Sequence, residues 1–343
     1  MVTVERGLRR RHFLGAFGAL GSIGAIGAVA SRPPACWAAP ADAYTLRMNV
    51  SHPATNTFGI IGLRFAAAVN RRSNGQLKVE VYPNGQLVGE QATADALANG
   101  VVDFAIQQTT ILEPLVPQFG VLDMPFLLKD FVTGFRVLGG PIGDQFLSAL
   151  ETKGIMALGW GFGGFKELET ANKAIVVPED MKGVRMRIGS STIYVATYKA
   201  LGAIPVVLDS SETFLALSQR AVDGIDLNLD TFASEKYDTL IKHVALANHF
   251  LTVSPLLASK RKIGALPAPL QKIIIEEGKA VSAFWLSLTV QNSAAAIQSL
   301  KKNGVAFTEP DHTAFRKAVD PVYAIYRSQF GNLVDTINRA ANR

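Results

Sequence analysis

Two arginines stand two residues apart in an apolar segment, VRMRI at 184–188, which a glycine and two serines follow. In a β-strand, side chains two apart point to the same face, so this spacing predicts Arg185 and Arg187 on one face of a strand. A charged side chain buried without a partner is costly, so each guanidinium needs either a ligand carboxylate or an acid of the chain. The candidate acids are Asp209, Glu212, Asp223 and Asp226.

The two arginines differ in their position along the expected strand. Arg187 is nearer the carboxyl end, and open α/β sheets bind ligands beyond the carboxyl ends of their strands. A guanidinium suits a carboxylate because its planar fork gives two parallel hydrogen bonds. The spacing alone leaves a structural role open for either arginine.

The sequence lacks the common catalytic and metal-binding patterns. There is no G-x-S-x-G elbow and no P-loop. The segment GWGFGG at 159–164 fits G-x-G-x-x-G, but Trp160 and Phe162 are bulky where a pyrophosphate would approach, so we predict a crossover between lobes instead. Asp123 is either a charged pocket wall or a buried loop acid bonded to backbone. Four histidines show neither HExxH nor clustered spacing, and we expect structural or solvated roles for His52, His243, His249 and His312. We expect no cofactor and no metal.

Most of the charge excess lies in residues 1–41. The 343-residue chain has a formal charge of +6, but this segment holds five of the 34 basic residues and one of the 28 acids, which leaves 29 and 27. The rest of the chain therefore has no basic stripe, and its charge does not predict nucleic-acid binding. The motif RRHFL at 10–14 precedes a glycine-rich apolar run and a region of small residues, which is typical of a twin-arginine export signal cleaved at 38–41. The alternative is a transmembrane anchor. Cleavage would remove the only cysteine, Cys36.

Strand-like and helix-like segments alternate along the rest of the chain. This alternation predicts an α/β fold with largely parallel sheets. Asp209 and Glu212 have the spacing of a capping box that opens a helix. Residues 267–303 contain no helix-breaking proline after Pro269, so we predict one helix of roughly 50 Å, which could span two lobes. The alternative is two helices broken near Gly278.

Several stretches, in this order and spacing, resemble one known family. They are YPNGQLVGE (82–90), LANGVVDFAI (97–106), VLDMPFLLKD (121–130), PEDMKGVRMRI (178–188), LGAIPV (201–206), ETFLALSQRAVDG (212–224) and KHV (242–244). The mature chain resembles the solute-binding proteins of tripartite ATP-independent periplasmic (TRAP) transporters, of the dicarboxylate and sialic-acid type. The resemblance implies a two-lobed periplasmic binding protein fold of type II, with crossing hinge strands and a long helix through both lobes. It also implies a small organic acid as ligand, TRAP permease subunits as partners and a periplasmic location.

The resemblance assigns different roles to the two arginines. In this family, the second basic residue of the strand after D-x-K-G grips the substrate carboxylate, and that position is Arg187. Arg185 then becomes the candidate for an internal partner. Lys166 is the nearest match to a second arginine found in several relatives. The other positions that the resemblance places at the site are Trp160, Gln107, Gln108, Ser190, Ser210, Asp226, Leu227 and Asn228.

Three departures make a sialic acid pocket unexpected. Ser190 and Leu227 stand where sialic-acid binders have asparagine, and Ser210 stands where they have phenylalanine. An organic acid remains the expected ligand, with a polyol or an aromatic acid as alternatives. We expect lobe I to comprise 42–165 and about 253–285, and lobe II to comprise 166–252 and about 286–343. An exported α/β hydrolase-like enzyme is the rival interpretation. A cytoplasmic regulator is disfavoured by the export signal and by the lack of a helix-turn-helix.

Overall fold

The computed structural model describes residues 43–341. The expected export signal and its cleavage region therefore lie outside the described residues. Within 43–341, no helix is both long and apolar enough to cross a membrane.

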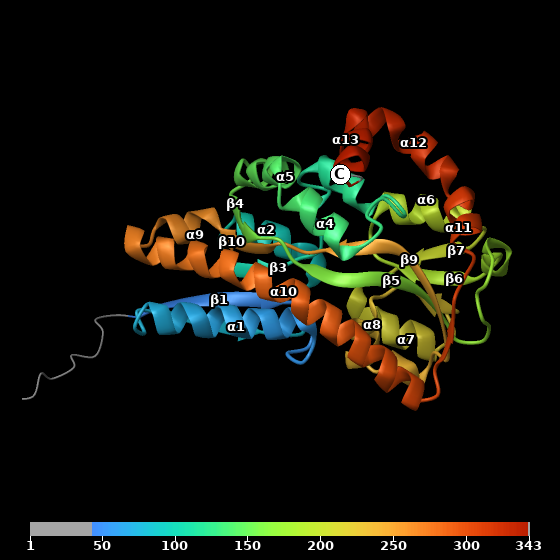
Figure 1. Ribbon diagram of the computed structural model, residues 1–343. Helices are drawn as coiled ribbons and strands as arrows, with labels where there is room; N and C mark the ends of the chain where they lie inside the picture. Colours follow the sequence, from blue (N-terminus) through green and yellow to red (C-terminus); the bar gives the residue numbers. More distant parts are fainter. Residues whose placement is uncertain (1–42, 342–343) are drawn as a thin grey trace, which may run out of the picture. The chain divides into compact units, whose positions relative to one another are not determined.

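The strands form two mixed β-sheets, one in each of two lobes (Figure 1). The sheet of lobe I has the order β2–β1–β3–β10–β4, with β1 parallel to β2 and β3 and with β10 antiparallel to both of its neighbours. Its strands are β1 (Tyr44–Val50), β2 (Leu77–Tyr82), β3 (Phe104–Ile106), β4 (Ile155–Gly159) and β10 (Leu256–Ser259).

The sheet of lobe II has the order β11–β9–β5–β8–β6–β7. Its parallel pairs are β11 with β9, β8 with β6 and β6 with β7, whereas β5 is antiparallel to β8 and β9. The strands are β5 (Phe162–Thr170), β6 (Arg185–Ile188), β7 (Ile204–Val207), β8 (Gly224–Ile225), β9 (His243–Val253) and β11 (Ala306–Thr308). The prediction of largely parallel sheets is only partly right, because the strands that run between the lobes enter as antiparallel neighbours.

The glycine-rich segment at 159–164 is the crossover between the sheets, as the sequence predicted. It joins β4 of lobe I to β5 of lobe II, and β9 returns beside β5. Gly161 and Ser254 exchange two backbone hydrogen bonds of 3.0 and 2.9 Å where the strands cross. A Cβ on Gly161 would lie 2.1 Å from the Trp285 ring, so only glycine fits.

One long helix, α10 (Ala268–Lys302, 35 residues), packs against elements of both lobes. It contacts α1 (Thr57–Arg72) and β4 on one side and β5 and α8 (Leu229–Ser234) further along (Figure 1). The alternative of two helices is wrong. Gly278 continues the helix, and its missing side chain lets Leu158 approach, because a Cβ there would lie 2.4 Å from the Leu158 Cβ.

The remaining helices cover the sheets and carry the loops of the site. On α1, Phe58, Ile61, Phe65 and Val69 form one buried stripe at helical spacing. The predicted capping box is confirmed, since Asp209 and Glu212 open the short helix before α7. The others are α2 (Thr93–Ala98), α3 (Thr109–Leu112), α4 (Phe131–Leu138), α5 (Pro141–Glu151), α6 (Thr192–Ala200), α7 (Thr213–Ser218), α9 (Lys260–Gly264), α11 (His312–Ala318), α12 (Asp320–Phe330) and α13 (Asn332–Ala341).

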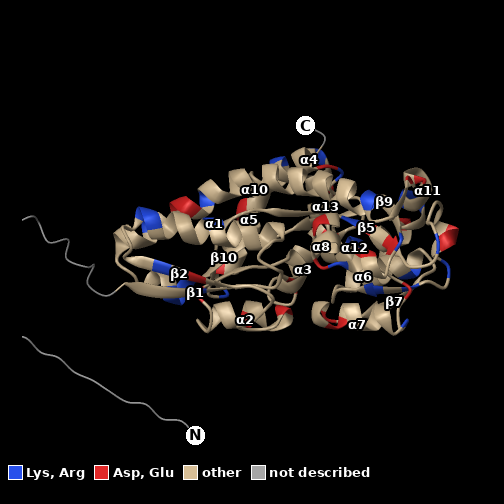
Figure 2. Cartoon of the chain, turned by 90° about the horizontal axis from the view of Figure 1, so that it is seen from below, with Lys and Arg blue, Asp and Glu red and all other residues tan. Residues whose placement is uncertain are grey.

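Basic and acidic residues are interspersed over both lobes (Figure 2). This distribution is in keeping with the even charge balance of the sequence after residue 41.

Candidate functional site

A cavity of about 550 Å³ lies between the two lobes. Its lobe I wall is made by the loops that follow β1 and β2 and by the turn at Glu90, and its lobe II wall is made by the loop after β7 and by the end of α8. Loops at the carboxyl ends of strands are where open α/β sheets bind ligands. The lining residues are Ser51, Pro53, Asn84, Gly85, Gly89, Glu90, Asp209, Ser210, Ser211, Phe214, Glu235 and Tyr237.

The lining is rich in oxygen atoms and contains three carboxylates. Asp209 is committed to its own helix, since it accepts hydrogen bonds from the backbone and hydroxyl of Ser211 at 3.0 and 2.9 Å. Glu235 accepts from His52 across the cleft. The carboxylate of Glu90 has no hydrogen-bond or ion-pair partner among residues 43–341. None of the lining residues is a lysine, arginine or histidine.

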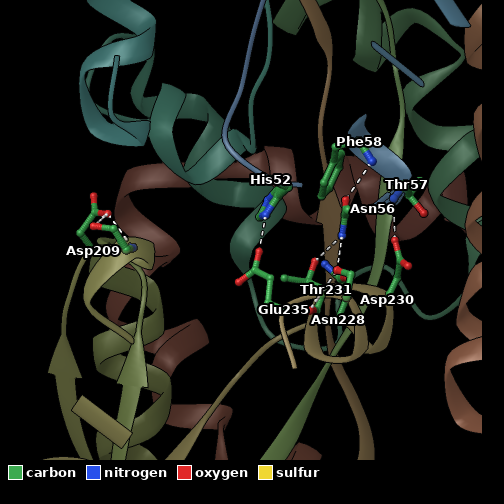
Figure 3. Close-up of polar contacts among 11 residues, drawn as sticks. His52, Asn56, Thr57, Phe58, Asp209, Asn228, Asp230, Thr231 and Glu235 are labelled. Carbon is green, nitrogen blue, oxygen red and sulfur yellow. Dashed lines mark hydrogen bonds and ion pairs between the residues drawn. The ribbon is translucent and has the colours of Figure 1, made fainter. Parts of the chain in front are cut away.

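Polar contacts join the lobes beside this cavity (Figure 3). Nδ1 of His52, after β1, lies 3.1 Å from a carboxylate oxygen of Glu235, after α8. Burial acts to lower the pKa of His52, but the hydrogen bond and charge of Glu235, with the charges of Glu90 and Asp230, outweigh it and raise the pKa above its ordinary value. The imidazolium form of His52 is therefore more favourable here than in a free histidine, and in that form it pairs ionically with Glu235.

Further interlobe bonds flank this ion pair. The Asn56 amide lies 3.2 Å from the Thr231 hydroxyl, and the backbone N–H of Thr57 donates to Asp230 at 2.7 Å (Figure 3). Ser190 donates to the side-chain oxygen of Gln91 at 3.0 Å. The described structure is thus a conformation in which the lobes touch at several polar points.

A second, much smaller cavity of about 10 Å³ adjoins the first and shares Ser51 and Glu90 with it. Three of its lining side chains have buried polar atoms with no hydrogen-bond partner in the described structure: Ser51 Oγ, Gln107 Oε1 and Ser254 Oγ. The side-chain nitrogen of Gln107 donates to the Glu90 carbonyl at 3.3 Å. Buried polar atoms normally have a hydrogen-bond partner, so these three atoms could each form a hydrogen bond with a polar group placed in this cavity. The other lining residues are His52, Phe58, Ile106 and Gln108.

Arg187 lies beside the large cavity, behind its lobe II wall. It is 5% exposed, and its Nε and Nη2 both donate to the carbonyl of Leu208, the residue before Asp209, at 3.2 and 2.8 Å. Burial raises the pKa of Tyr237, which lines the cavity, and the positive charge of Arg187 acts to lower it. Among residues 43–341 no carboxylate lies within 4 Å of the Arg187 guanidinium. The Nη1–Nη2 edge therefore keeps donors for an incoming carboxylate.

Arg185, on the same strand, has the internal partner that the resemblance implied. Its Nε and Nη2 bind the two oxygens of Asp223 at 2.9 and 2.7 Å. The pair is partly exposed, with 41% of the Arg185 side chain and 33% of the Asp223 side chain accessible. The hydrogen bond from Arg185 lowers the pKa of Asp223. Of the four candidate acids, Asp223 is the one that pairs with this guanidinium.

Lys166 and Asp226 form a buried pair beneath the site. The Lys166 ammonium donates to the Asp226 carbonyl at 2.9 Å and lies 3.7 Å from its carboxylate. It also lies 5.4 Å from the centre of the Tyr194 ring. Burial raises the pKa of Asp226, against the charges of Lys166 and Arg187. The charges of Lys166 and Arg187 both act on the Asp226 carboxylate, and the charge of Lys166 also acts on two other buried acids, Asp123 and Glu169.

The structure brings some of the expected site residues together and places others elsewhere. Ser210 lines the large cavity, Gln107 and Gln108 line the small one, and Ser190 bridges the lobes. Trp160 does not line either cavity; its ring packs 6.4 Å from those of Phe119 and Phe146, because the crossover turns it into the core.

Two more of the expected site residues have structural roles near the site. Leu227 belongs to the core of lobe II, and its backbone N–H donates to buried Glu169 at 2.8 Å. Asn228 caps α8, accepting from the Thr231 N–H at 3.0 Å. Asp123 is buried and does not line either cavity, but it ends a short 3-10 helix (Pro117–Asp123) and its partner is the Ser191 hydroxyl at 3.3 Å, where the sequence suggested a loop acid bonded to backbone.

Sequence reasoning missed the residues that depend on how the lobes meet. They are His52, Glu90, Glu235, Tyr237 and Ser254. Glu90 ends one of the matched stretches and could have been singled out, whereas Glu235 and Ser254 lie in segments without a distinctive pattern. Among the described residues, no group of three or more metal-ligating side chains is present.

Residues 48–329 match the model of the family described as "Bacterial extracellular solute-binding protein, family 7" (DctP). The chain belongs to this family. It is 30% identical over 306 residues to the C4-dicarboxylate-binding periplasmic protein DctP of Shewanella loihica, covering 87% of this chain and 89% of the relative.

Two solved structures of this solute-binding type match the fold closely. The sugar acid binding protein DctPAm of Advenella mimigardefordensis, in complex with galactonate, has a TM-score of 0.85 and 26% identity, covering 88% of this chain and 98% of that one. A TRAP periplasmic solute-binding protein of Sulfurospirillum deleyianum with bound succinate has a TM-score of 0.84 and 26% identity, covering 88% and 100%. The predictions of a TRAP solute-binding fold, and of a transporter component in place of an enzyme, are confirmed.

Proposed function

We propose that this family 7 protein captures a small organic acid between its lobes, with Arg187 binding the carboxylate. The observation that carries this proposal is a guanidinium that is 5% exposed and has no carboxylate within 4 Å among residues 43–341. It binds the carbonyl of Leu208, the residue before Asp209, which lines a cavity of about 550 Å³. A buried charge without a counter-charge is costly, and a ligand carboxylate would supply one. The nearby Asp226 carboxylate lies 3.7 Å from Lys166 and forms no ion pair with Arg187 among the described residues.

The relatives support the same chemistry. One is described as binding C4-dicarboxylates, and two solved neighbours hold galactonate and succinate, both of which are carboxylates. We infer that the loaded protein delivers its acid to the membrane permease subunits of a TRAP transporter. The lobe boundaries proposed above, 42–165 with about 253–285 and 166–252 with about 286–343, place Arg187 and Ser210 in lobe II and Gln107 in lobe I.

Residues 1–41 serve, in this proposal, as a twin-arginine signal that sends the protein to the periplasm. The support is the motif with Arg10 and Arg11 before a glycine-rich apolar run. Replacing both with lysine should leave precursor in the cytoplasm, as seen on fractionation. Normal periplasmic accumulation of this double variant would contradict the twin-arginine assignment.

Thermal denaturation against a panel of organic acids tests the binding function. A ligand that binds only the folded state at about a hundred times its Kd stabilises it by roughly 2.7 kcal/mol, which is readily seen as a raised melting temperature. We expect a saturable rise with at least one carboxylate and no rise with the corresponding amide. Equal stabilisation by acid and amide would contradict a carboxylate clamp.

A further inference from the structure

We propose that the site selects a hydroxylated monocarboxylate over a dicarboxylate, with a ligand hydroxyl bound at the small cavity beside Gln107. This inference rests on the proposed function, since Arg187 supplies the carboxylate subsite. It adds the chemistry of the other end of the ligand, which the lobe I wall defines.

The first support is the set of unpaired polar atoms at the small cavity. Gln107 is 2% exposed and Ser254 is fully buried, yet Gln107 Oε1, Ser254 Oγ and Ser51 Oγ have no hydrogen-bond partner in the described structure. The bond from the Gln107 amide nitrogen to the Glu90 carbonyl leaves Oε1 as an acceptor at this cavity. Because Ser51 and Glu90 also line the large cavity, a ligand held there can extend one group into the small one.

The second support is the number of donors and acceptors that these atoms require. A serine hydroxyl needs an acceptor for its proton, whereas the Gln107 oxygen needs a donor. A ligand hydroxyl supplies both at once. An ammonium only donates, and a carboxylate only accepts, so either would leave a buried group unpaired, which is the costly outcome. A volume of about 10 Å³ is close to that of one water-sized group.

The third support is charge. The Glu90 carboxylate lines both cavities without a side-chain partner among residues 43–341, and a second ligand carboxylate would face it. His52 is the one basic side chain among the residues lining the small cavity, and Glu235 already pairs with it. The wall is therefore suited to a hydroxyl and opposed to a second anion.

Calorimetric titration of the purified protein with four-carbon acids tests the inference. Erythronate carries hydroxyls, succinate a second carboxylate, 4-aminobutanoate an ammonium, and butanoate none of these. We expect wild type to bind erythronate at least tenfold more tightly than each of the other three. Gln107→Leu should remove most of the preference for erythronate over butanoate, and Glu90→Gln should strengthen succinate binding severalfold.

The outcomes separate this inference from the proposed function. Succinate or 4-aminobutanoate binding as tightly as erythronate, with the binding lost in Arg187→Ala, overturns the inference alone. An unchanged ratio of erythronate to butanoate affinity in a folded Gln107→Leu variant also overturns it, because the small cavity then holds only a structural water. Binding of none of the four acids overturns the inference, and the thermal panel of organic acids then decides separately whether the proposed function stands. The wild-type ratios decide the question even if a variant fails to fold.

Discussion

Arg185 and Arg187 occupy the same face of β6 and have different partners. Asp223 stands just before β8 and accepts hydrogen bonds from Arg185 with both oxygens. The Arg187 guanidinium, nearer the carboxyl end of the strand, binds only the Leu208 carbonyl among residues 43–341. Position along the strand therefore separates a structural arginine from one that can meet a ligand. Burial lowers the pKa of His249 to about 3, and the charge of Lys166 acts in the same direction, so this imidazole is neutral at neutral pH.

His52 gives the contact between the lobes a pH dependence. Its pKa is raised in the folded protein above the ordinary 6.5, because Glu235, Glu90 and Asp230 outweigh burial. The stabilisation is therefore fully present below 6.5 and is lost as the pH rises through the raised pKa. We expect the melting temperature of wild type to exceed that of His52→Gln at low pH and the difference to shrink at alkaline pH. A difference that grows with pH would contradict the ion pair with Glu235.

At the scale of elements, local sequence patterns predicted the frame well. Four elements lie where the sequence predicted them: the strands at 44–50 and 77–82, the capping box at Asp209 and the long helix through Gly278. Each of these features depends on residues close in sequence. Two features could not be predicted from the sequence: the antiparallel pairing of β9 with β5 and the small cavity beside Ser254. Both depend on segments that meet only when the lobes are assembled. The packing of Trp160 in the core, away from both cavities, likewise depends on such contacts.

A substitution at Gly278 tests whether α10 packs closely against Leu158 of lobe I. In Gly278→Ala the new Cβ would lie 2.4 Å from the Leu158 Cβ, so we expect a loss of about 1–3 kcal/mol in the free energy of unfolding. Gly264→Ala is the matched control, since a Cβ on that exposed glycine of α9 meets nothing within 4 Å. It should be neutral or stabilise by up to about 1 kcal/mol. Urea unfolding measures both, and equal effects would contradict the close approach of Leu158.

At the scale of the whole described chain, two crossing strands and α10 join lobes that also touch through side chains. The bonds of His52 with Glu235 and of Ser190 with Gln91 are made directly between side chains of opposite lobes. Such bonds can break without disturbing either core. The architecture is therefore suited to hinge motion about β5 and β9.

Small-angle scattering tests that motion. We expect the radius of gyration to fall when a saturating organic acid is added, because the ligand would bridge Arg187 of lobe II and the wall of lobe I. Arg187→Ala should show no such change at the same acid concentration. A scattering profile of wild type that stays the same at saturation would contradict closure around the ligand.

The most direct test of the carboxylate clamp is calorimetric titration of the best-binding acid into Arg187→Ala, with Arg185→Ala as the matched control from the same strand face. Removing one member of a desolvated charge pair costs roughly 2–5 kcal/mol, and about 1.4 kcal/mol is tenfold in affinity, so the clamp predicts binding weakened roughly thirty-fold to a few thousand-fold. Arg187→Lys should recover little, since a point charge cannot reproduce the planar fork. Arg185→Ala should lower the melting temperature and leave the Kd near that of wild type. A Kd for Arg187→Ala equal to that of wild type would contradict the account.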